Sequence, residues 1–178
     1  MSGARHNDDK TGSGSIIVRP ATAADSAAIT GLLARCYPLA YAGWYEAELL
    51  SRALPFMISA NPGLIASGTF HVAFLDRRLA GCGGWSPCAP DGRQRAGTAN
   101  LRHFAVDPAA MRRGIGRALF LRCRDEARAR GFTRLECQSS LPAEAFYRRL
   151  GFERAEAMAI TLPDGTAFPG VLMQAAIT

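Results

Sequence analysis

The sequence predicts an α/β or α+β fold in which one mixed sheet is flanked by helices. Apolar residues alternate in some segments and recur at helical spacing in others, so both kinds of element are expected. Their order along the chain is β-α-α-β-β-β-α-β-α-β-β, which gives about seven strands and about four helices. The 178 residues suit one domain, and the 48% hydrophobic fraction is enough for a packed core.

The first third of the chain is expected to form one strand and two helices. An apolar run that stops at Pro20 predicts the strand, and Thr22 or Asp25 can cap the first helix. Pro38 and Pro55 are expected to end the two helices, because proline lacks an amide proton. Residues 56–68 are ambiguous. The expected elements are a strand over 16–19 and helices over 25–35 and 44–54.

The rest of the chain alternates strands with two further helices. Residues 114–130 form the clearest helix, because an apolar face lies opposite a face of arginines. A loop rich in proline, glycine and arginine over 86–97 is long enough to be functional or mobile. The expected strands are 69–75, 79–85, 100–106, 133–138, 152–162 and 171–176, and the last helix is 142–150.

Arginine dominates the positive charge. The formal net charge is +6, Lys10 is the only lysine, and fourteen of the twenty arginines lie between residues 93 and 154. Such a cluster can bind nucleic acid, attract a smaller polyphosphate ligand, or form the solvated surface of a helix. Composition alone leaves these three interpretations open.

The chain lacks the signatures of a membrane, secreted or zinc-binding protein. No apolar run reaches the roughly 18 residues that a membrane span requires. Residues 1–15 are polar and rich in glycine and serine, so we expect a disordered leader before a single domain over 16–178, and no secretory signal. Five cysteines without repeated spacing and three scattered histidines favour a reduced, cytoplasmic protein with no metal site.

The strongest local signal is the segment VDPAAMRRGIGR over residues 106–117, where a strand, a short loop and two glycines lead into a long helix. Such a turn can present consecutive backbone N–H groups to an anion, and flanking arginines can pair with phosphate oxygens. The alternative is a helix start that packs tightly on a sheet, for which glycine is also suited. The segment is neither a Walker loop nor a complete dinucleotide fingerprint.

The second signal is the segment AEAFYRRLGF over residues 143–152. One interpretation is an amphipathic helix that buries Phe146 and Leu150 and half-buries Tyr147. The other is that Tyr147 donates a proton during catalysis, although the ordinary pKa of tyrosine is near 10. The helix alone does not decide between them.

Together, the order and spacing of these segments resemble the GCN5-related N-acetyltransferase superfamily over about residues 16–176. The resemblance rests on RPATAAD before the first helix, the hairpin around 76–78, the loop with G-x-G, the strand LECQSS and the helix FYRRLGF. It implies the fold of that superfamily, with a V-shaped opening in the central sheet. It also implies acetyl-CoA as cosubstrate, an amine acceptor and, since many members pair two copies, a homodimer. From the residues themselves we expect no metal, no nucleic acid and no membrane as partner.

The resemblance assigns residues to the cosubstrate. The backbone of Phe104, Ala105 and Val106 would pair with the pantetheine arm, and Ser140 stands where many members carry an asparagine that touches this arm. Met111 replaces the usual glutamine or arginine, which removes a polar side chain but no backbone donor. The loop residues that would cradle the pyrophosphate are Met111, Arg112, Arg113, Gly114, Ile115, Gly116 and Arg117.

By the same resemblance, catalysis would be direct attack of an amine on the thioester, without a covalent intermediate. Tyr147 matches the tyrosine that protonates the leaving thiolate. The amide of Phe104 or a close neighbour is the candidate oxyanion donor. The cysteines Cys82, Cys88 and Cys137 then have no catalytic role, and core packing is expected for them.

The base that accepts the amine proton is not fixed by the sequence. Many members carry a glutamate where this chain has Asn100, which can orient a water molecule but cannot accept the proton. His103 is a second candidate, although strand alternation puts it on the face opposite Asn100, Arg102 and Phe104, and a packed histidine is the alternative. A carboxylate of the second helix region is a third candidate, either Glu46 or Glu48.

The acceptor is expected between the first two helices, the 86–97 loop and the C-terminal hairpin. Aromatic residues there either wall a pocket for an apolar or cationic acceptor or belong to the core. They are Tyr37, Tyr41, Trp44, Tyr45 and Trp85.

Three functions follow from these features. The first is an N-acetyltransferase that acts on a small-molecule amine. The second is an acetyl-CoA-binding sensor with little or no catalysis, which Met111 and Asn100 motivate. The third is a nucleic-acid-binding protein, for which the chain has arginines but no recognised motif.

Overall fold

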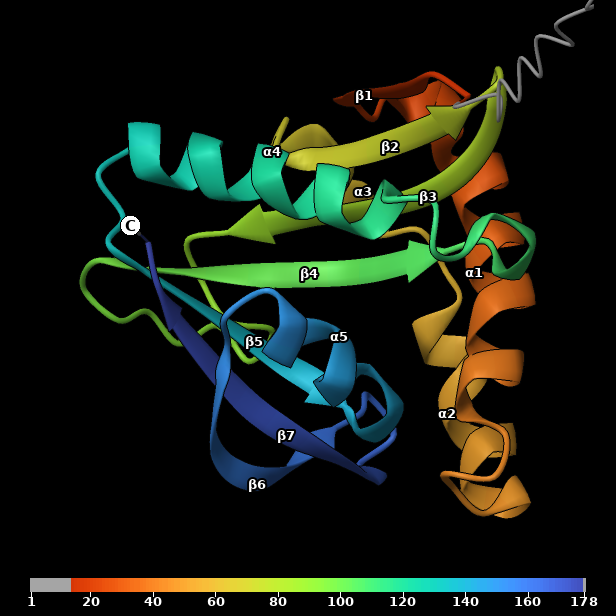
Figure 1. Cartoon of the computed structure of the whole chain (residues 1–178). Helices are drawn as coiled ribbons and strands as arrows, with labels where there is room; N and C mark the ends of the chain where they lie inside the picture. Colours follow the sequence, from red (N-terminus) through yellow and green to blue (C-terminus); the bar gives the residue numbers. More distant parts are fainter. Residues whose placement is uncertain (1–13, 178) are drawn as a thin grey trace, which may run out of the picture.

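A mixed sheet of seven strands organises the protein (Figure 1). The computed structural model describes residues 14–177. The strand order is β1-β2-β3-β4-β5-β7-β6, and only the neighbours β4 and β5 are parallel. This confirms the predicted mixed sheet. The strands are β1 (Ile16–Pro20), β2 (Phe70–Leu75), β3 (Arg78–Ser86), β4 (Thr98–Val106), β5 (Arg134–Ser140), β6 (Glu153–Thr161) and β7 (Ala167–Ala176).

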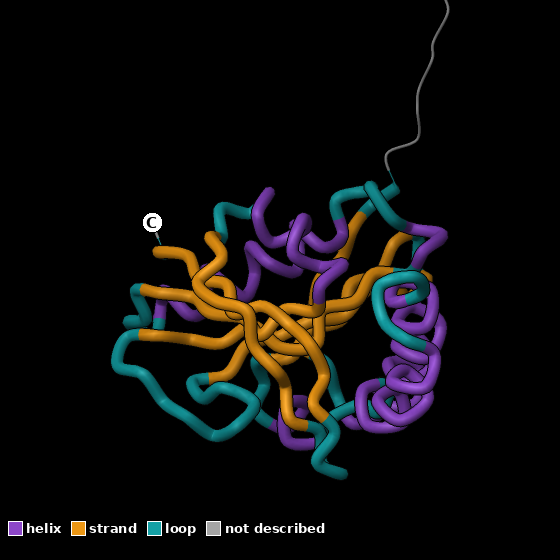
Figure 2. Tube along the Cα trace, turned by 90° about the horizontal axis from the view of Figure 1, so that it is seen from below, coloured by secondary structure: helices purple, strands orange, loops and turns teal. Residues whose placement is uncertain are grey.

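Helices cover both faces of the strongly twisted sheet (Figure 2). One of them lies in the stretch over 56–68 that the sequence left ambiguous. Short 3-10 turns occur at Ala23–Asp25, Pro108–Ala110 and Leu141–Ala143. The helices are α1 (Ser26–Tyr41), α2 (Ala47–Met57), α3 (Pro62–Ala66), α4 (Ile115–Ala129) and α5 (Glu144–Arg149).

The predicted ends of the first two helices are wrong, because each helix continues through its proline. Pro38 lies in the last turn of α1 and Pro55 in the last turn of α2. A proline so close to the end removes one backbone hydrogen bond without preventing the final turn. In α1 that final turn buries Tyr37 and Tyr41, whose rings stack with their centroids 5.2 Å apart. Burial of two aromatic rings outweighs the missing hydrogen bond.

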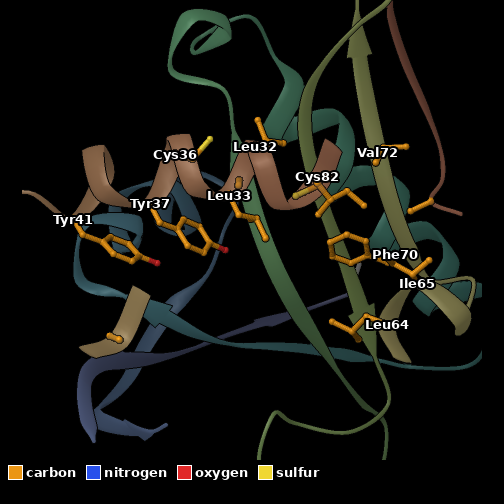
Figure 3. Close-up of a cluster of buried hydrophobic side chains, with 14 of the residues drawn as sticks. Leu32, Leu33, Cys36, Tyr37, Tyr41, Leu64, Ile65, Phe70, Val72 and Cys82 are labelled. Carbon is orange, nitrogen blue, oxygen red and sulfur yellow. The ribbon is translucent and has the colours of Figure 1, made fainter. Parts of the chain in front are cut away.

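Two layers of side chains fill the core. On one face, α1 and α3 pack on β2 and β3 through residues such as Leu32, Leu33, Phe70 and Val72 (Figure 3). On the other face, α4 packs through Ile115 and other apolar residues, and α5 closes the C-terminal half. The sheet is therefore buried on both sides, and β4 is its central strand.

The strands β4 and β5 separate soon after they begin. They pair only over residues 98–100 of β4 and 134–136 of β5. Beyond these residues β4 stays with β3, and β5 stays with β7 over its whole length. The two halves of the sheet diverge toward α1, as Figure 1 shows. This is the predicted V-shaped opening.

Two predictions concern the chain as a whole: a disordered leader and the absence of a membrane span. The expected leader over 1–15 lies outside the described residues except for its last two positions, so its disorder stays a prediction. Within residues 14–177, no helix is both long and apolar enough to cross a membrane.

Candidate active site

A bulge in β4 sets the shape of the site. The pairing of β4 with β3 shifts between Ala105, opposite Cys82, and Arg102, opposite Gly84. Two residues of β4, His103 and Phe104, therefore lie opposite one residue of β3. His103 has a positive φ of 50°. Because a bulge breaks the alternation of side chains, the expectation that His103 faces away from Arg102 is wrong. Both residues line the same cavity, and the ring of Phe104 packs near Tyr147.

The opening between β4 and β5 leads into a first cavity of about 390 Å³. Beyond Asn100 the edge of β4 that faces β5 has no strand partner, so this edge is free to pair with a ligand. Its lining joins the end of β4 to α1, to the loop before α4 and to α5. Among the predicted cosubstrate residues, the structure brings Phe104, Ala105, Val106, Met111, Ser140 and Tyr147 together here.

The loop before α4 has the geometry of an anion-binding turn. Arg112 and Gly114 both have a positive φ, of 62° and 84°. The backbone N–H groups of Arg112, Arg113 and Gly114 have no acceptor within the described part of the chain. Successive free amides at a helix N-terminus form a nest for an anion. The residues present therefore fit a pyrophosphate group.

The arginines of this loop differ from most of the others in the arginine-rich region. At least six arginines of that region form ion pairs with carboxylates of the chain, including Arg122 with Glu126 at 2.6 Å and Arg95 with Glu136 at 3.1 Å. Within residues 14–177, Arg112, Arg113 and Arg117 form none. Three arginines without an ion pair in the described residues thus lie in the loop or in the first turn of α4, close to the free amides.

The two glycines of the loop serve different purposes. Gly114 permits the left-handed turn, which L-residues adopt at a cost. Gly116 permits close packing, because a Cβ atom there would lie 2.9 Å from Cε2 of Phe146. The tight packing that the sequence left open for this segment is thus found at Gly116, whereas the anion-binding role of the turn at Gly114 stays a prediction.

Tyr147 lines the first cavity. It is buried among the rings of Phe104, Phe146 and Phe152. Burial raises the pKa of Tyr147 well above its usual value, so the phenol keeps its proton at neutral pH. A protonated phenol in this position can act as a proton donor but not as a base.

A second cavity, of about 430 Å³, adjoins the first. It is walled by the segments expected around an acceptor: α1, α2, the loop at Pro90 and the β6–β7 hairpin. The two cavities share a group of lining residues and therefore lie next to each other. The shared residues are Tyr37, Tyr41, Phe104, Ser140, Ala143 and Tyr147.

The five aromatic residues expected around the acceptor divide between pocket, core and surface, and Trp44 is the exposed one. Tyr37 and Tyr41 line both cavities, and their rings lie side by side along α1 (Figure 3). Tyr45 is structural, since its hydroxyl accepts from the Leu141 amide at 2.7 Å and donates to the Pro169 carbonyl at 2.9 Å. Trp85 is buried on the α4 side of the sheet.

The candidate bases occupy different places. Asn100 is buried where β4 meets β5, opposite Glu136, and lines neither of the two cavities described above. Glu46 and Glu48 do not line either of these two cavities. His103 lines the second cavity, where burial and then the charge of Arg102 lower its pKa to about 4. His103 is therefore neutral at physiological pH.

The buried cysteines carry no thiolate. Burial raises the pKa of Cys36 to about 11 and raises the pKa values of Cys82, Cys123 and Cys137 further. Within residues 14–177 there is also no cluster of three or more histidine, cysteine, aspartate or glutamate side chains that could hold a metal ion.

The sequence of the chain matches a known family. A model of the acetyltransferase (GNAT) family matches residues 27–152 of the chain. The chain belongs to the GNAT acetyltransferase family. The match includes α1, the open strand β4, the loop before α4 and Tyr147.

Solved structures of N-acetyltransferases share the fold. The PaiA N-acetyltransferase of Thermoplasma acidophilum, solved with coenzyme A, is 18% identical, with a TM-score of 0.69 over 91% of this chain and 99% of that one. A GCN5-related N-acetyltransferase of Rhodopseudomonas palustris is 18% identical, with a TM-score of 0.69 over 90% and 94%. The ribosomal-protein-S18-alanine N-acetyltransferase of Escherichia coli is 20% identical, with a TM-score of 0.61 over 92% and 95%. Among curated protein sequences, none matches this chain.

Proposed function

We propose that this protein transfers the acetyl group of acetyl-CoA to the primary amine of a small-molecule acceptor by direct attack. The observation that carries the proposal is the junction of two cavities at the open edge of β4, with Tyr147 at the point where they meet. A thioester in the first cavity and an amine in the second would lie against each other there.

The first cavity would hold acetyl-CoA along the open strand. The free amides and the unpaired arginines before α4 suit the pyrophosphate, and the edge of β4 suits the amide groups of the pantetheine arm. Met111 and the other apolar lining residues would contact the hydrocarbon part of this arm. The unpaired edge near Phe104 also supplies a candidate N–H donor for the thioester oxygen.

For the chemical step, the side chains of the protein would need to supply only proton transfers. The amine nitrogen attacks the thioester carbon, the C–S bond breaks, and the Tyr147 hydroxyl gives its proton to the leaving thiolate. The amine would enter in its neutral form, since no described residue of the second cavity is a carboxylate that could hold an ammonium. The nitrogen's proton would pass to water or to the neutral imidazole of His103, and water would return a proton to Tyr147.

A panel of amines tests this proposal. Purified protein, acetyl-CoA and each amine are mixed, and release of the coenzyme A thiol is followed. Turnover that depends on the amine and yields the acetylated amine supports the proposal.

The alternative is an acetyl-CoA-binding sensor of the same fold. The absence of a carboxylate from the described lining of the second cavity favours it, together with Met111 in the phosphate loop. Binding of acetyl-CoA without thiol release over a broad amine panel would favour this alternative. Amine-dependent release of thiol would exclude it.

A further inference from the structure

Arg102 brings a positive charge into the second cavity without an acidic partner. Its Nη1 donates to the hydroxyl Oγ of Ser86 at 3.1 Å, and it makes no ion pair with any residue between 14 and 177. Burial lowers the pKa of Arg102, but a guanidinium stays charged at neutral pH. One neutral acceptor satisfies only one of its five N–H donors.

The rest of the cavity does not compensate this charge. None of its described lining residues is an aspartate or a glutamate. Phe56, Met57 and Phe168 give it a largely apolar wall, and Gln138 adds a polar group from β5. A half-buried cation in such surroundings is costly unless an anion joins it, so the cavity favours a ligand that carries one.

We propose that the acceptor is a small amine that also carries a carboxylate, and that Arg102 binds this carboxylate. The inference deepens the proposed function and rests on it. A single guanidinium matches the single charge of a carboxylate and can bind both of its oxygens, whereas a phosphate monoester would bring nearly two charges. An acceptor with a second cationic group would meet repulsion from Arg102. The apolar wall would hold the hydrocarbon part of the acceptor.

Matched acceptors test the inference by activity. Phenylalanine is compared with phenylalaninamide and 2-phenylethylamine, and 4-aminobutyrate with propylamine. In the wild type, each carboxylate-bearing amine should have a kcat/KM at least about tenfold above that of its partner without the carboxylate. Arg102→Gln should raise the KM for the carboxylate-bearing amines at least about tenfold and remove the preference, with the KM for acetyl-CoA unchanged.

Two further variants separate a binding role from a structural one. Arg102→Lys keeps the charge and should retain part of the preference. Arg124→Gln removes an arginine that pairs with Asp125 on the surface of α4 and should leave the preference intact. Equal use of amines with and without a carboxylate by the wild type, or an equal loss of both in Arg102→Gln, would overturn the inference.

A binding experiment separates failure of this inference from failure of the proposed function. The protein is saturated with coenzyme A and titrated with N-acetylphenylalanine or its amide. If the acid alone binds, and Arg102→Gln abolishes its binding, the carboxylate site stands even when no amine is acetylated. If carboxylate-free amines are acetylated and the acid does not bind, the proposed function stands and the inference is wrong.

Discussion

At the scale of single residues, Tyr147 is the side chain on which the proposed chemistry depends most. It lines both cavities, and its raised pKa keeps the hydroxyl protonated. Loss of a general acid costs on the order of a hundredfold in rate. We expect Tyr147→Phe to lower kcat by about that factor and to leave the Kd for acetyl-CoA unchanged, because the ring still fills its place. Steady-state kinetics and calorimetry measure the two quantities.

Tyr45 provides the control for that variant. Its hydroxyl makes two hydrogen bonds that join the start of α2 to Leu141 and Pro169, and it lines neither of the two cavities. Tyr45→Phe should lower the free energy of unfolding by about 1–2 kcal/mol with kcat nearly unchanged. A kcat loss in Tyr45→Phe equal to that in Tyr147→Phe would argue against an acid role for Tyr147.

The sequence predicted some of these residues and missed others for a physical reason. Tyr147 and the loop before α4 belong to short local motifs that stand out in the sequence, and the resemblance then gave them their roles. The positions of Arg102 and His103 depend on the bulge in β4, which is a property of how β4 pairs with β3 and leaves no mark in the alternation of residues. Trp85 shows the same limit, since an aromatic residue gives no sign of which face of the sheet it occupies.

At the scale of elements, the approach of α4 to α5 depends on Gly116. A Cβ atom at this position would press on the ring of Phe146. We expect Gly116→Ala to lower the free energy of unfolding by about 1–3 kcal/mol, as other over-packed cores do. Denaturant unfolding measures the change.

A second glycine within a helix gives the matched comparison. In α1, a Cβ atom at Gly31 would meet only the end of the Arg35 side chain, at 3.6 Å. Gly31→Ala should therefore raise the free energy of unfolding by about 0.4–1 kcal/mol. If both variants changed stability by the same amount and sign, packing against Phe146 would not be the reason for glycine at 116.

The order of the elements could be read from the sequence, but their spatial relation could not. Alternation and helical spacing predicted all seven strands and both long helices on their own. The separation of β4 from β5 came only from the resemblance, because the residues after Asn100 read as an ordinary strand. The continuation of α1 past Pro38 was missed because it depends on the burial of Tyr37 and Tyr41 in the finished core.

At the scale of the whole molecule, two histidines tie stability to pH. Burial lowers the pKa of His103 to about 4 and also lowers the pKa of His71, which lies beside Glu126. Unfolded histidines take up a proton near pH 6.5, whereas the folded ones resist it. Stability is therefore complete above about pH 6.5 and falls as the pH drops toward 4, by at most about 3 kcal/mol for His103.

Urea unfolding at several pH values tests this account. We expect His103→Gln to flatten the decline between pH 6.5 and 4, while the remaining slope reflects His71 and carboxyl groups whose pKa the fold lowers, such as Glu126. An unchanged slope in the variant would show that His103 is not held neutral by the fold.

The proposed function depends on the two cavities at the open end of the sheet, and its central claim is that the protein binds acetyl-CoA. Calorimetric titration of the full chain with acetyl-CoA tests it most directly. Micromolar binding is expected, together with at least about tenfold weaker binding in Arg112→Glu/Arg113→Glu. The double variant Arg124→Glu/Arg134→Glu makes the same change in net charge away from both cavities and should bind as the wild type does. Absence of binding by the wild type, or equal weakening in both double variants, would contradict the account.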